Sequence, residues 1–295
     1  MLKIQFLNGG LANQAFQYIF ARHFELSHPG EIMYMDDSYF ALNTVHNGYE
    51  LEKVFGIKPH MLSGVFDQDV WEYMLEQKKQ GKSIPQILKE NGEDINMITE
   101  TVNYRQFNPF DGKVYEIKPG GYDPNILGFD ENIYYHGYWL NREWFKKYKQ
   151  QFLKEFQFPL ITDEYNKSLM DRILNANSTA IHIRRGDFVD INIAYDANKY
   201  REMTQKYLDY FGGDTTLFVF SDDITWCKEN SDAMLMNQFK DCVFVEGNMN
   251  GKNYMDLQLM SHCRYMIIGH SSFAFLAALL NTGLLGCINA SDREI

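Results

Sequence analysis

The chain has 295 residues, of which 45% are hydrophobic and 23% charged, the composition of a globular protein with room for two domains. Its formal net charge of -11 argues against a general nucleic-acid binder, because such proteins neutralise phosphates with an excess of basic residues. No window approaches the roughly 18 apolar residues of a membrane span, and the N-terminus enters a strand pattern without a cleavable signal. We therefore expect a cytoplasmic protein with no transmembrane segment, whose four cysteines are free, buried thiols.

The first half begins with a strand, a glycine-bearing loop and a helix. The pattern predicts the strand over residues 2–7 and the loop over 8–14, with the helix starting near Gln14. Such a loop places backbone N–H groups at the start of a helix, where they can hold an anion. Its spacing matches neither a Walker loop nor G-x-G-x-x-G, so a tight turn without a ligand stays an open alternative.

The rest of the first half is less regular. Proline and glycine interrupt residues 38–132, where we expect loops and the recognition of an acceptor substrate. A Lys-rich helix over 142–156 ends before Phe158-Pro159, which we take as the domain boundary. The other predicted elements are strands at 31–35 and 133–139 and helices at 67–79 and 84–90.

Strands and helices alternate regularly in the second half. Each predicted strand is a short apolar run that ends in a polar or glycine-bearing loop, which is typical of a doubly wound parallel sheet. In such sheets, ligands bind at the carboxyl ends of the strands. The predicted strands span 178–183, 216–220, 242–246, 265–268 and 284–288, and the helices between them span 162–174, 198–211, 225–230 and 253–262, with a last one ending at Asn281.

Three of the loops in the second half suit a phosphate-bearing ligand. Arg184-Arg-Gly-Asp187 follows strand 178–183 at once, and arginine offers a planar fork of donors that matches phosphate oxygens. Ser221–Asp223 and Gly269–Ser272 would lie at the same edge, with Asp256 on the helix before the latter loop. A carboxylate there can accept from both N1–H and the exocyclic amine of guanine. These features favour a nucleotide or nucleotide-sugar site.

Plainer interpretations of the single motifs stay open. The Arg184–Asp187 run also suits a surface ion pair beside a turn, and its Arg-Gly-Asp triplet is found in cell-adhesion motifs. His182 would also fit as a satisfied strand histidine, and Ser271 as a helix cap.

Four co-linear motifs carry a resemblance that covers nearly the whole chain. In them the chain resembles the bacterial α-1,2-fucosyltransferases of glycosyltransferase family 11 and, more distantly, the α-1,6- and protein O-fucosyltransferases, which share an H-x-R-R core. The motifs are Gly9-Gly-Leu-Ala-Asn-Gln-Ala-Phe-Gln-Tyr18, His182-Ile-Arg-Arg-Gly-Asp187, Phe220-Ser-Asp-Asp223, and Asp256-Leu-Gln-Leu-Met-Ser261 together with Ile267-Ile-Gly-His-Ser-Ser-Phe273.

The resemblance implies an α/β, GT-B-like fold, with two Rossmann-like domains that face each other across a cleft and the second a doubly wound parallel sheet. Residues 1–157 would form the acceptor-side domain and residues 158–295 the GDP-sugar-binding domain. The implied reaction is inverting, metal-independent transfer of L-fucose from GDP-fucose to the 2-hydroxyl of a galactoside in a surface glycan. GDP-fucose would be the donor substrate, with no cofactor.

The implied partners are GDP-fucose and a galactose-containing oligosaccharide or lipid-linked glycan acceptor, the latter compatible with peripheral membrane contact. Two alternatives stay open. One is a transferase that uses another GDP-sugar or another acceptor hydroxyl, and the other is a catalytically silent protein that binds a nucleotide or a glycan.

The resemblance also implies roles for single residues. Arg184 would grip the β-phosphate and neutralise the leaving GDP, while His182 and Asp256 would contact the guanosine. Ser271 or Ser272 would hydrogen-bond the phosphates, and Asp222 or Asp223 would line the nucleotide pocket. Gly10 and Asn13 would approach the pyrophosphate or the fucose.

We take Arg184, Asp187 and Asn13 as the candidate catalytic residues. The general base is open between Asp187, Asp190 and Asp37, and Asp187 would alternatively orient Arg184. Asp67-Gln-Asp69 has the D-x-D form by which many other glycosyltransferases hold a metal. Because this triplet lies outside the four motifs, we assign no metal site to it.

Overall fold

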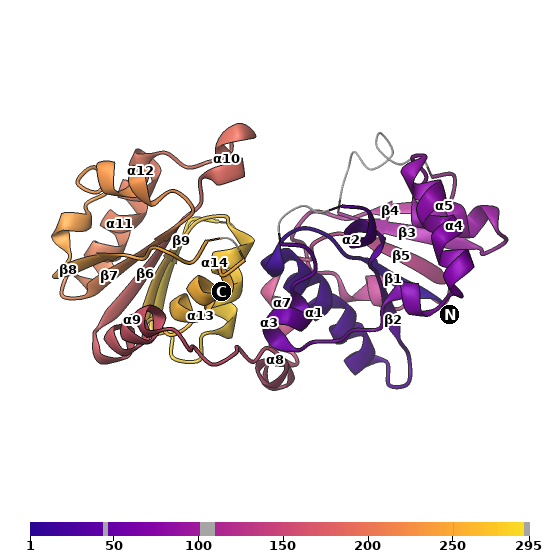
Figure 1. Cartoon of the computed structure of the whole chain (residues 1–295), viewed down its shortest axis with the longest axis horizontal. Coiled ribbons are helices and arrows are strands. Elements are labelled where there is room, and N and C mark those ends of the chain that lie inside the picture. The colour runs from indigo at the N-terminus through magenta and orange to yellow at the C-terminus, as the bar shows by residue number, and fades with distance from the viewer. Residues whose placement is uncertain (44–46, 101–109, 250, 292–295) are drawn as a thin grey trace. The chain divides into compact units, whose positions relative to one another are not determined.

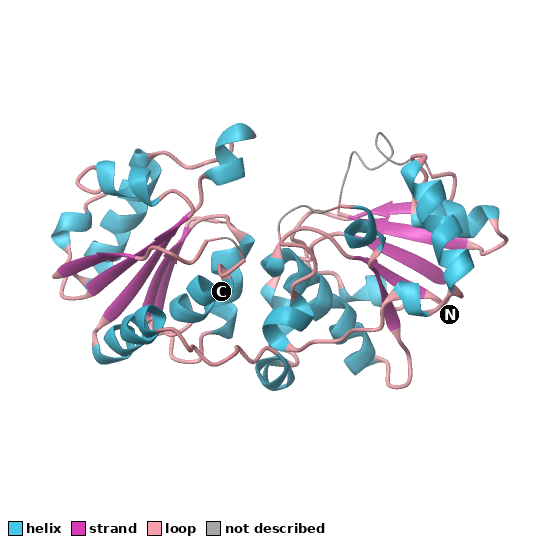
Figure 2. Ribbon diagram, viewed as in Figure 1, coloured by secondary structure: helices cyan, strands magenta, loops and turns pink. Residues whose placement is uncertain are grey.

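The computed structural model describes residues 1–43, 47–100, 110–249 and 251–291 (Figure 1). The chain forms two compact units, Met1–Gln157 and Phe158–Ile295. Within the described residues, each unit is built on a five-stranded sheet whose strands pair only in parallel, with helices packed against it (Figure 2). The prediction of an α/β, GT-B-like chain with two Rossmann-like domains is confirmed in the fold of each unit.

The sheet of the first unit has the strand order β2-β1-β5-β3-β4. Because β1 pairs with both β2 and β5, the glycine-bearing loop after β1 lies beside the carboxyl ends of these two strands. The sequence pattern did not predict β3 and β4. The strands are β1 (Lys3–Phe6), β2 (Met33–Asp36), β3 (Ile95–Thr99), β4 (Val114–Glu116) and β5 (Asn132–His136).

Two helices of the first unit differ from the prediction. The first begins at Leu11 rather than near Gln14, because Gly9 makes a left-handed turn (φ 78°) and Gly10 already caps the helix in extended backbone. The helix predicted over 142–156 is broken after Lys146. The helices are α1 (Leu11–Ser27), α2 (Ser38–Leu42), α3 (Leu51–Phe55), α4 (Gln68–Lys79), α5 (Ile84–Glu90), α7 (Arg142–Lys146) and α8 (Lys149–Glu155).

The sheet of the second unit has the strand order β10-β9-β6-β7-β8. Numbered along the chain from β6 as strand 1, this is the 3-2-1-4-5 order of a Rossmann fold. Successive strands are added on one side of β6 and then, from β9, on the other, so the strand order reverses between β6 and β9. The predicted doubly wound parallel sheet is confirmed. Its strands are β6 (Ser178–Ile183), β7 (Thr216–Ser221), β8 (Asp241–Phe244), β9 (Tyr265–Ile268) and β10 (Gly286–Asn289).

Helices cover both faces of this second sheet (Figure 1). Side chains alternate along β6, so Ile181 and Ile183 pack in one core cluster with Tyr200 and Tyr207, whereas His182 faces Phe273 on the other side. The helices are α9 (Glu164–Asn175), α10 (Gly186–Asp190), α11 (Ala197–Phe211), α12 (Ile224–Glu229), α13 (Tyr254–Met260) and α14 (Ser272–Leu280).

Two general expectations from the sequence can be compared with the structure. The cysteines are free thiols, but only Cys227 and Cys263 are buried, while Cys242 and Cys287 are partly exposed. Among the helices of the described residues, none has both the length and the apolar character needed to cross a membrane.

Candidate functional site

The candidate donor site lies at the carboxyl edge of the second sheet. Strand β6 pairs with β7 on one side and β9 on the other, with His182 opposite both Phe220 and Ile268. The loops that follow these three strands therefore meet at the position where the strand order reverses, which is where α/β sheets of this kind bind ligands. The structure thus brings together the Arg184, Asp222 and Ser271 loops.

Arg184 is held in place by two carboxylates. Its Nη2 lies 2.7 Å from Oδ1 of Asp187 and its Nη1 lies 2.7 Å from Oδ2 of Asp222. The guanidinium also lies 5.6 Å from the ring centroid of Phe188. Its side chain is still 35% exposed. Since partly exposed ion pairs add only about 0–1 kcal/mol to stability, these contacts matter chiefly for orienting the guanidinium fork.

Arg185 and Asp223 anchor the loop. The backbone N–H of Arg185 donates to Oδ1 of Asp222 (2.8 Å), and its guanidinium lies 3.9 Å from the ring centroid of Trp226. Asp223 accepts from the backbone N–H of Trp226 (3.0 Å) and thereby caps α12. Both aspartates predicted to line a nucleotide pocket thus have partners within the protein.

Gly186 is required by the close approach of Asp222. A Cβ atom at position 186 would come within 2.6 Å of Oδ2 of Asp222, the oxygen that pairs with Arg184. A larger residue would therefore displace the carboxylate that orients the arginine.

His182 has an unused polar atom next to this arginine. The side chain is buried, and its Nδ1 has no hydrogen-bond partner among the described residues. Burial, with a smaller contribution from the Arg184 charge, lowers the pKa of His182 to about 3. The ring is therefore neutral at physiological pH. Because buried polar atoms are nearly always paired, Nδ1 is suited to a ligand.

Asp256 belongs to a hydrogen-bond chain that the sequence pattern did not reveal. Nδ2 of Asn248 donates to Oδ1 of Asp256 (2.8 Å), and Asn248 exchanges amide hydrogen bonds with Asn166 (2.8 and 2.9 Å). Asn166 in turn donates to Asp163, the cap of α9. Desolvation raises the pKa of Asp256 to about 7. These asparagines come from separate segments, so no local motif connects them.

Hydroxyls lie at the start of α14, as predicted. Ser271 is the N-cap residue and is buried, but its hydroxyl makes no capping hydrogen bond, and Ser272 begins the helix. The preceding His270 stacks on Phe188 of α10 (centroids 4.9 Å apart) and meets Tyr195 edge-on (4.4 Å). This aromatic packing ties the loop after β9 to the loop after β6.

Gly10 and Asn13 lie in the first unit. Gly10 caps α1, and Asn13 lies in the first turn of that helix. The loop is tightly packed, since a Cβ atom on Gly9 would meet Nδ2 of Asn13 at 2.7 Å. The buried Gln14 donates to the carbonyls of Gly9 (2.8 Å) and Gly48 (2.9 Å) and so fixes the loop at the carboxyl edge of this sheet.

The three candidate bases differ in their surroundings. Asp187 pairs with Arg184, whereas Asp190 ends α10 in an exposed position. Asp37 accepts from the hydroxyl (2.6 Å) and the backbone N–H (3.1 Å) of Ser63, and desolvation raises its pKa. The pairing of Asp187 matches the alternative in which it orients the arginine.

The D-x-D triplet lies at the start of α4, where both Asp67 and Asp69 are exposed. Across the ranges that the structure describes, no group of three His, Cys, Asp or Glu side chains is arranged to hold a metal ion.

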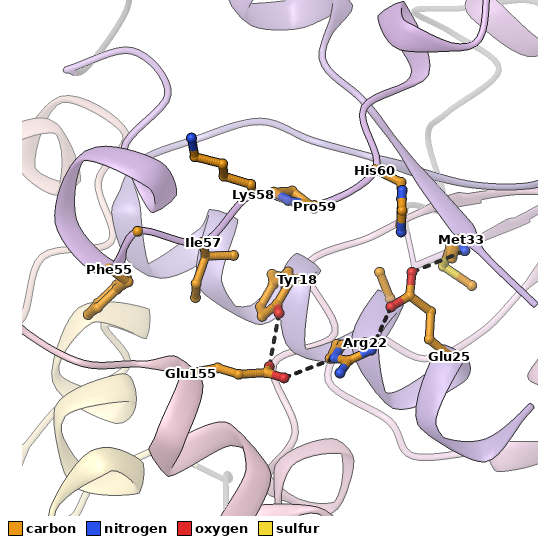
Figure 3. A pocket seen from close by; sticks show the side chains of 12 residues that line it. Tyr18, Arg22, Glu25, Met33, Phe55, Ile57, Lys58, Pro59, His60 and Glu155 are labelled. Carbon is orange, nitrogen blue, oxygen red and sulfur yellow. Dashed lines mark hydrogen bonds and ion pairs between the residues drawn. The ribbon is translucent and has the colours of Figure 1, made fainter. Parts of the chain in front are cut away.

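A separate pocket of about 280 Å³ lies in the first unit beside the middle and end of α1 (Figure 3). Its polar wall is a network in which Glu155 accepts from the Tyr18 hydroxyl (2.9 Å) and from Arg22 (3.0 Å), and Arg22 also pairs with Glu25 (3.0 Å). Glu25 accepts from the backbone N–H of Met33, where β2 begins. The pocket therefore lies toward the amino ends of the strands, away from the glycine loop, and no sequence pattern predicted it.

Comparisons with known proteins identify the family. The family model described as glycosyl transferase family 11 matches residues 4–288. An α-1,2-colitosyltransferase of Escherichia coli is 29% identical over 286 residues, which cover 95% of this chain and 88% of that protein. Galactoside alpha-(1,2)-fucosyltransferase 2 of Oryctolagus cuniculus is 31% identical over 108 residues, 35% of this chain and 29% of its own length.

Among solved structures, NodZ α-1,6-fucosyltransferase soaked with GDP-fucose shares 11% sequence identity at a TM-score of 0.49, covering 95% of this chain and 93% of that chain. The match of the family model over nearly the whole sequence is consistent with the motifs and with the two α/β units. The chain belongs to glycosyl transferase family 11 and is a fucosyltransferase-like glycosyltransferase.

Proposed function

We propose that the protein transfers L-fucose from GDP-fucose to the 2-hydroxyl of a galactoside, with inversion and without a metal ion. The observation that carries this proposal is the position of Arg184, a partly exposed guanidinium fixed at the switch point of the second sheet. The fork of donors there suits a diphosphate.

Arg184 acts on the leaving group. The acceptor 2-oxygen forms a bond to the anomeric carbon while the bond from that carbon to the β-phosphate oxygen breaks. The electron pair leaves with GDP, and the hydroxyl proton passes to a base. Negative charge develops on the phosphate, so a guanidinium already held in position stabilises the transition state more than the ground state.

His182 and Asp256 select the nucleotide in this proposal. The unpaired Nδ1 of the neutral His182 hydrogen-bonds the guanosine. Asn248 bonds only Oδ1 of Asp256 and leaves the second carboxylate oxygen available. In the proposal this carboxylate accepts from N1–H and the exocyclic amine of guanine. Adenine presents no such pair of donors, so the carboxylate favours guanine.

A second candidate donor is supported by the relative named as a colitosyltransferase, whose match covers 95% of this chain. A colitosyl group is a fucosyl group without its 3-hydroxyl, so the same site chemistry would serve a GDP-colitose donor. The galactoside acceptor is supported by the name of the Oryctolagus cuniculus relative, a galactoside alpha-(1,2)-fucosyltransferase. A surface glycan is supported by a 34% match over 113 residues to an O-antigen biosynthesis glycosyltransferase of Escherichia coli.

The test is a transfer assay with GDP-fucose or GDP-colitose as donor and lactose as acceptor, in the presence of EDTA. We expect GDP release and a trisaccharide product whose NMR spectrum shows an α-linkage to the galactose 2-oxygen. Faster transfer of colitose would favour the second donor. No GDP release from either donor, with or without lactose, would contradict the proposed transferase activity. It would support a catalytically silent binding protein.

A further inference from the structure

A strained turn follows β5 at the carboxyl edge of the first sheet. Trp139 has φ 56°, in the left-handed region that a bulky residue rarely adopts. Its side chain is fully buried, its indole N–H donates to Oε1 of Gln5 (2.6 Å), and its ring stacks on Phe20 (centroids 4.1 Å apart). These contacts hold the residue in its unfavourable conformation.

Glu100 fixes the same turn from the end of β3. One carboxylate oxygen accepts from the backbone N–H groups of both Tyr138 and Trp139 (2.8 Å each), and the other accepts from Gly120 (2.8 Å). Gly137 has no space for a side chain, because a Cβ atom there would come within 2.6 Å of Glu100. A buried carboxylate thus sets the direction in which residue 138 leaves the backbone.

The turn presents Tyr138 to solvent. The residue is 38% exposed, and its hydroxyl accepts a hydrogen bond from Nδ2 of Asn8 (3.4 Å). Asn8 belongs to the loop after β1, the neighbour of β5, and is itself fixed by reciprocal hydrogen bonds with Gln17. The aromatic ring therefore lies beside the glycine loop on a rigid support, and strain of this kind is typical of ligand sites.

We propose that Tyr138 and Asn8 form the sugar-binding platform of the acceptor, a site for a galactopyranose ring. The inference rests on the proposed function and adds the acceptor contact in the first unit. A pyranose has an apolar C–H face that packs on an exposed aromatic ring, and hydroxyls that suit a phenol and an amide. Asn8 and the tyrosine hydroxyl supply these polar groups next to the ring.

The test measures the Kd of methyl β-D-galactopyranoside by saturation-transfer NMR, which does not require turnover. We expect Tyr138→Ala to weaken binding at least tenfold and Tyr138→Phe to weaken it less, because the latter keeps the ring and loses only the hydroxyl. Tyr138→Leu, which keeps apolar volume without an aromatic face, carries the test if the alanine variant does not fold. Tyr73→Ala is the matched control, since Tyr73 is an exposed tyrosine on α4 of the same unit.

The thermal shift induced by GDP, measured on every variant, checks the donor site separately. The proposal is overturned if Tyr138→Ala or Tyr138→Leu binds the galactoside like the wild type, or if the wild type responds to GDP and binds no galactoside. Absence of a GDP shift in the wild type would instead contradict the proposed function.

Discussion

At the residue scale, the proposed function assigns to Arg184 the stabilisation of the leaving diphosphate. We expect Arg184→Ala to lower kcat by about 10²–10³, the usual effect of removing one preorganised donor at a developing charge. Arg184→Lys should recover only part of this loss, because lysine keeps the charge and loses the fork. Steady-state kinetics with GDP-fucose and lactose measure both effects.

Arg201→Ala is the control for these variants. Arg201 is an exposed arginine on α11 whose guanidinium donates to the carbonyl of Ala233. A kcat for Arg184→Ala within a few-fold of that for Arg201→Ala would exclude Arg184 from the chemistry.

Asp256 should make guanine recognition depend on pH. Only the ionised carboxylate accepts from both guanine donors, and its pKa of about 7 leaves much of it protonated below neutral pH. We expect GDP affinity to rise between pH 6 and 8, and IDP, which lacks the exocyclic amine, to bind more weakly than GDP. Calorimetry on Asp256→Asn should show little difference between the two nucleotides. A GDP preference retained in that variant would contradict the assignment.

The same carboxyl group affects folding. Its pKa is raised above the unfolded value of about 3.9, so between these two values the folded state keeps a proton that the unfolded state loses. Its contribution to stability is therefore present at low pH and is lost as pH rises through about 7. In denaturant titrations without nucleotide, we expect the free energy of unfolding of Asp256→Asn to fall less between pH 5 and 8 than that of the wild type. An equal fall in both proteins would contradict the raised pKa of Asp256.

At the scale of elements, the start of α10 depends on a glycine. In Gly186→Ala the new methyl group would displace Oδ2 of Asp222, which orients Arg184. We expect GDP binding to weaken at least tenfold while the protein stays folded, as measured by calorimetry and circular dichroism. Gly283→Ala is the control, because its Cβ would meet only Oδ1 of Asn281 at 3.8 Å. Equal GDP affinity in both variants would show that the approach of Asp222 is unimportant.

Sequence patterns predicted the elements whose signals are local. Strands β6 and β9 and helix α5 have the expected bounds, since apolar runs and flanking polar or proline residues mark them. Strand β3 was missed because it is buried on both faces, so its side chains show no alternation. Its partner β4 has only three residues. Such strands are defined by tertiary pairing rather than by local pattern.

For the candidate site, the sequence predicted which loops lie together but not the long-range contacts that support them. The topology places Arg184, His182 and the Ser271 loop together, because all of them follow or end adjacent parallel strands. The amide chain from Asn248 to Asn166 and the grip of Glu100 on the turn after β5 join segments far apart in sequence. No spacing rule within one segment reveals contacts of this kind.

At the scale of the whole molecule, the two units carry different chemistry. The second unit holds the arginine, the neutral histidine and the carboxylate to which we assign the binding of a guanine nucleotide, whereas the first holds the glycine loop and the aromatic turn. The proposed transfer reaction fits this division, with donor binding assigned to the second unit and acceptor binding to the first.

The most direct test of the donor assignment is a thermal-shift comparison of GDP, UDP, ADP and CMP, each with and without EDTA. A ligand at 100 times its Kd stabilises by about 2.7 kcal/mol. At about 2–4 °C per kcal/mol, that corresponds to a shift of several degrees in Tm. We expect such a shift with GDP alone, unchanged by EDTA. No shift with GDP, an equal shift with UDP, or loss of the GDP shift in EDTA would contradict a metal-independent GDP-sugar transferase.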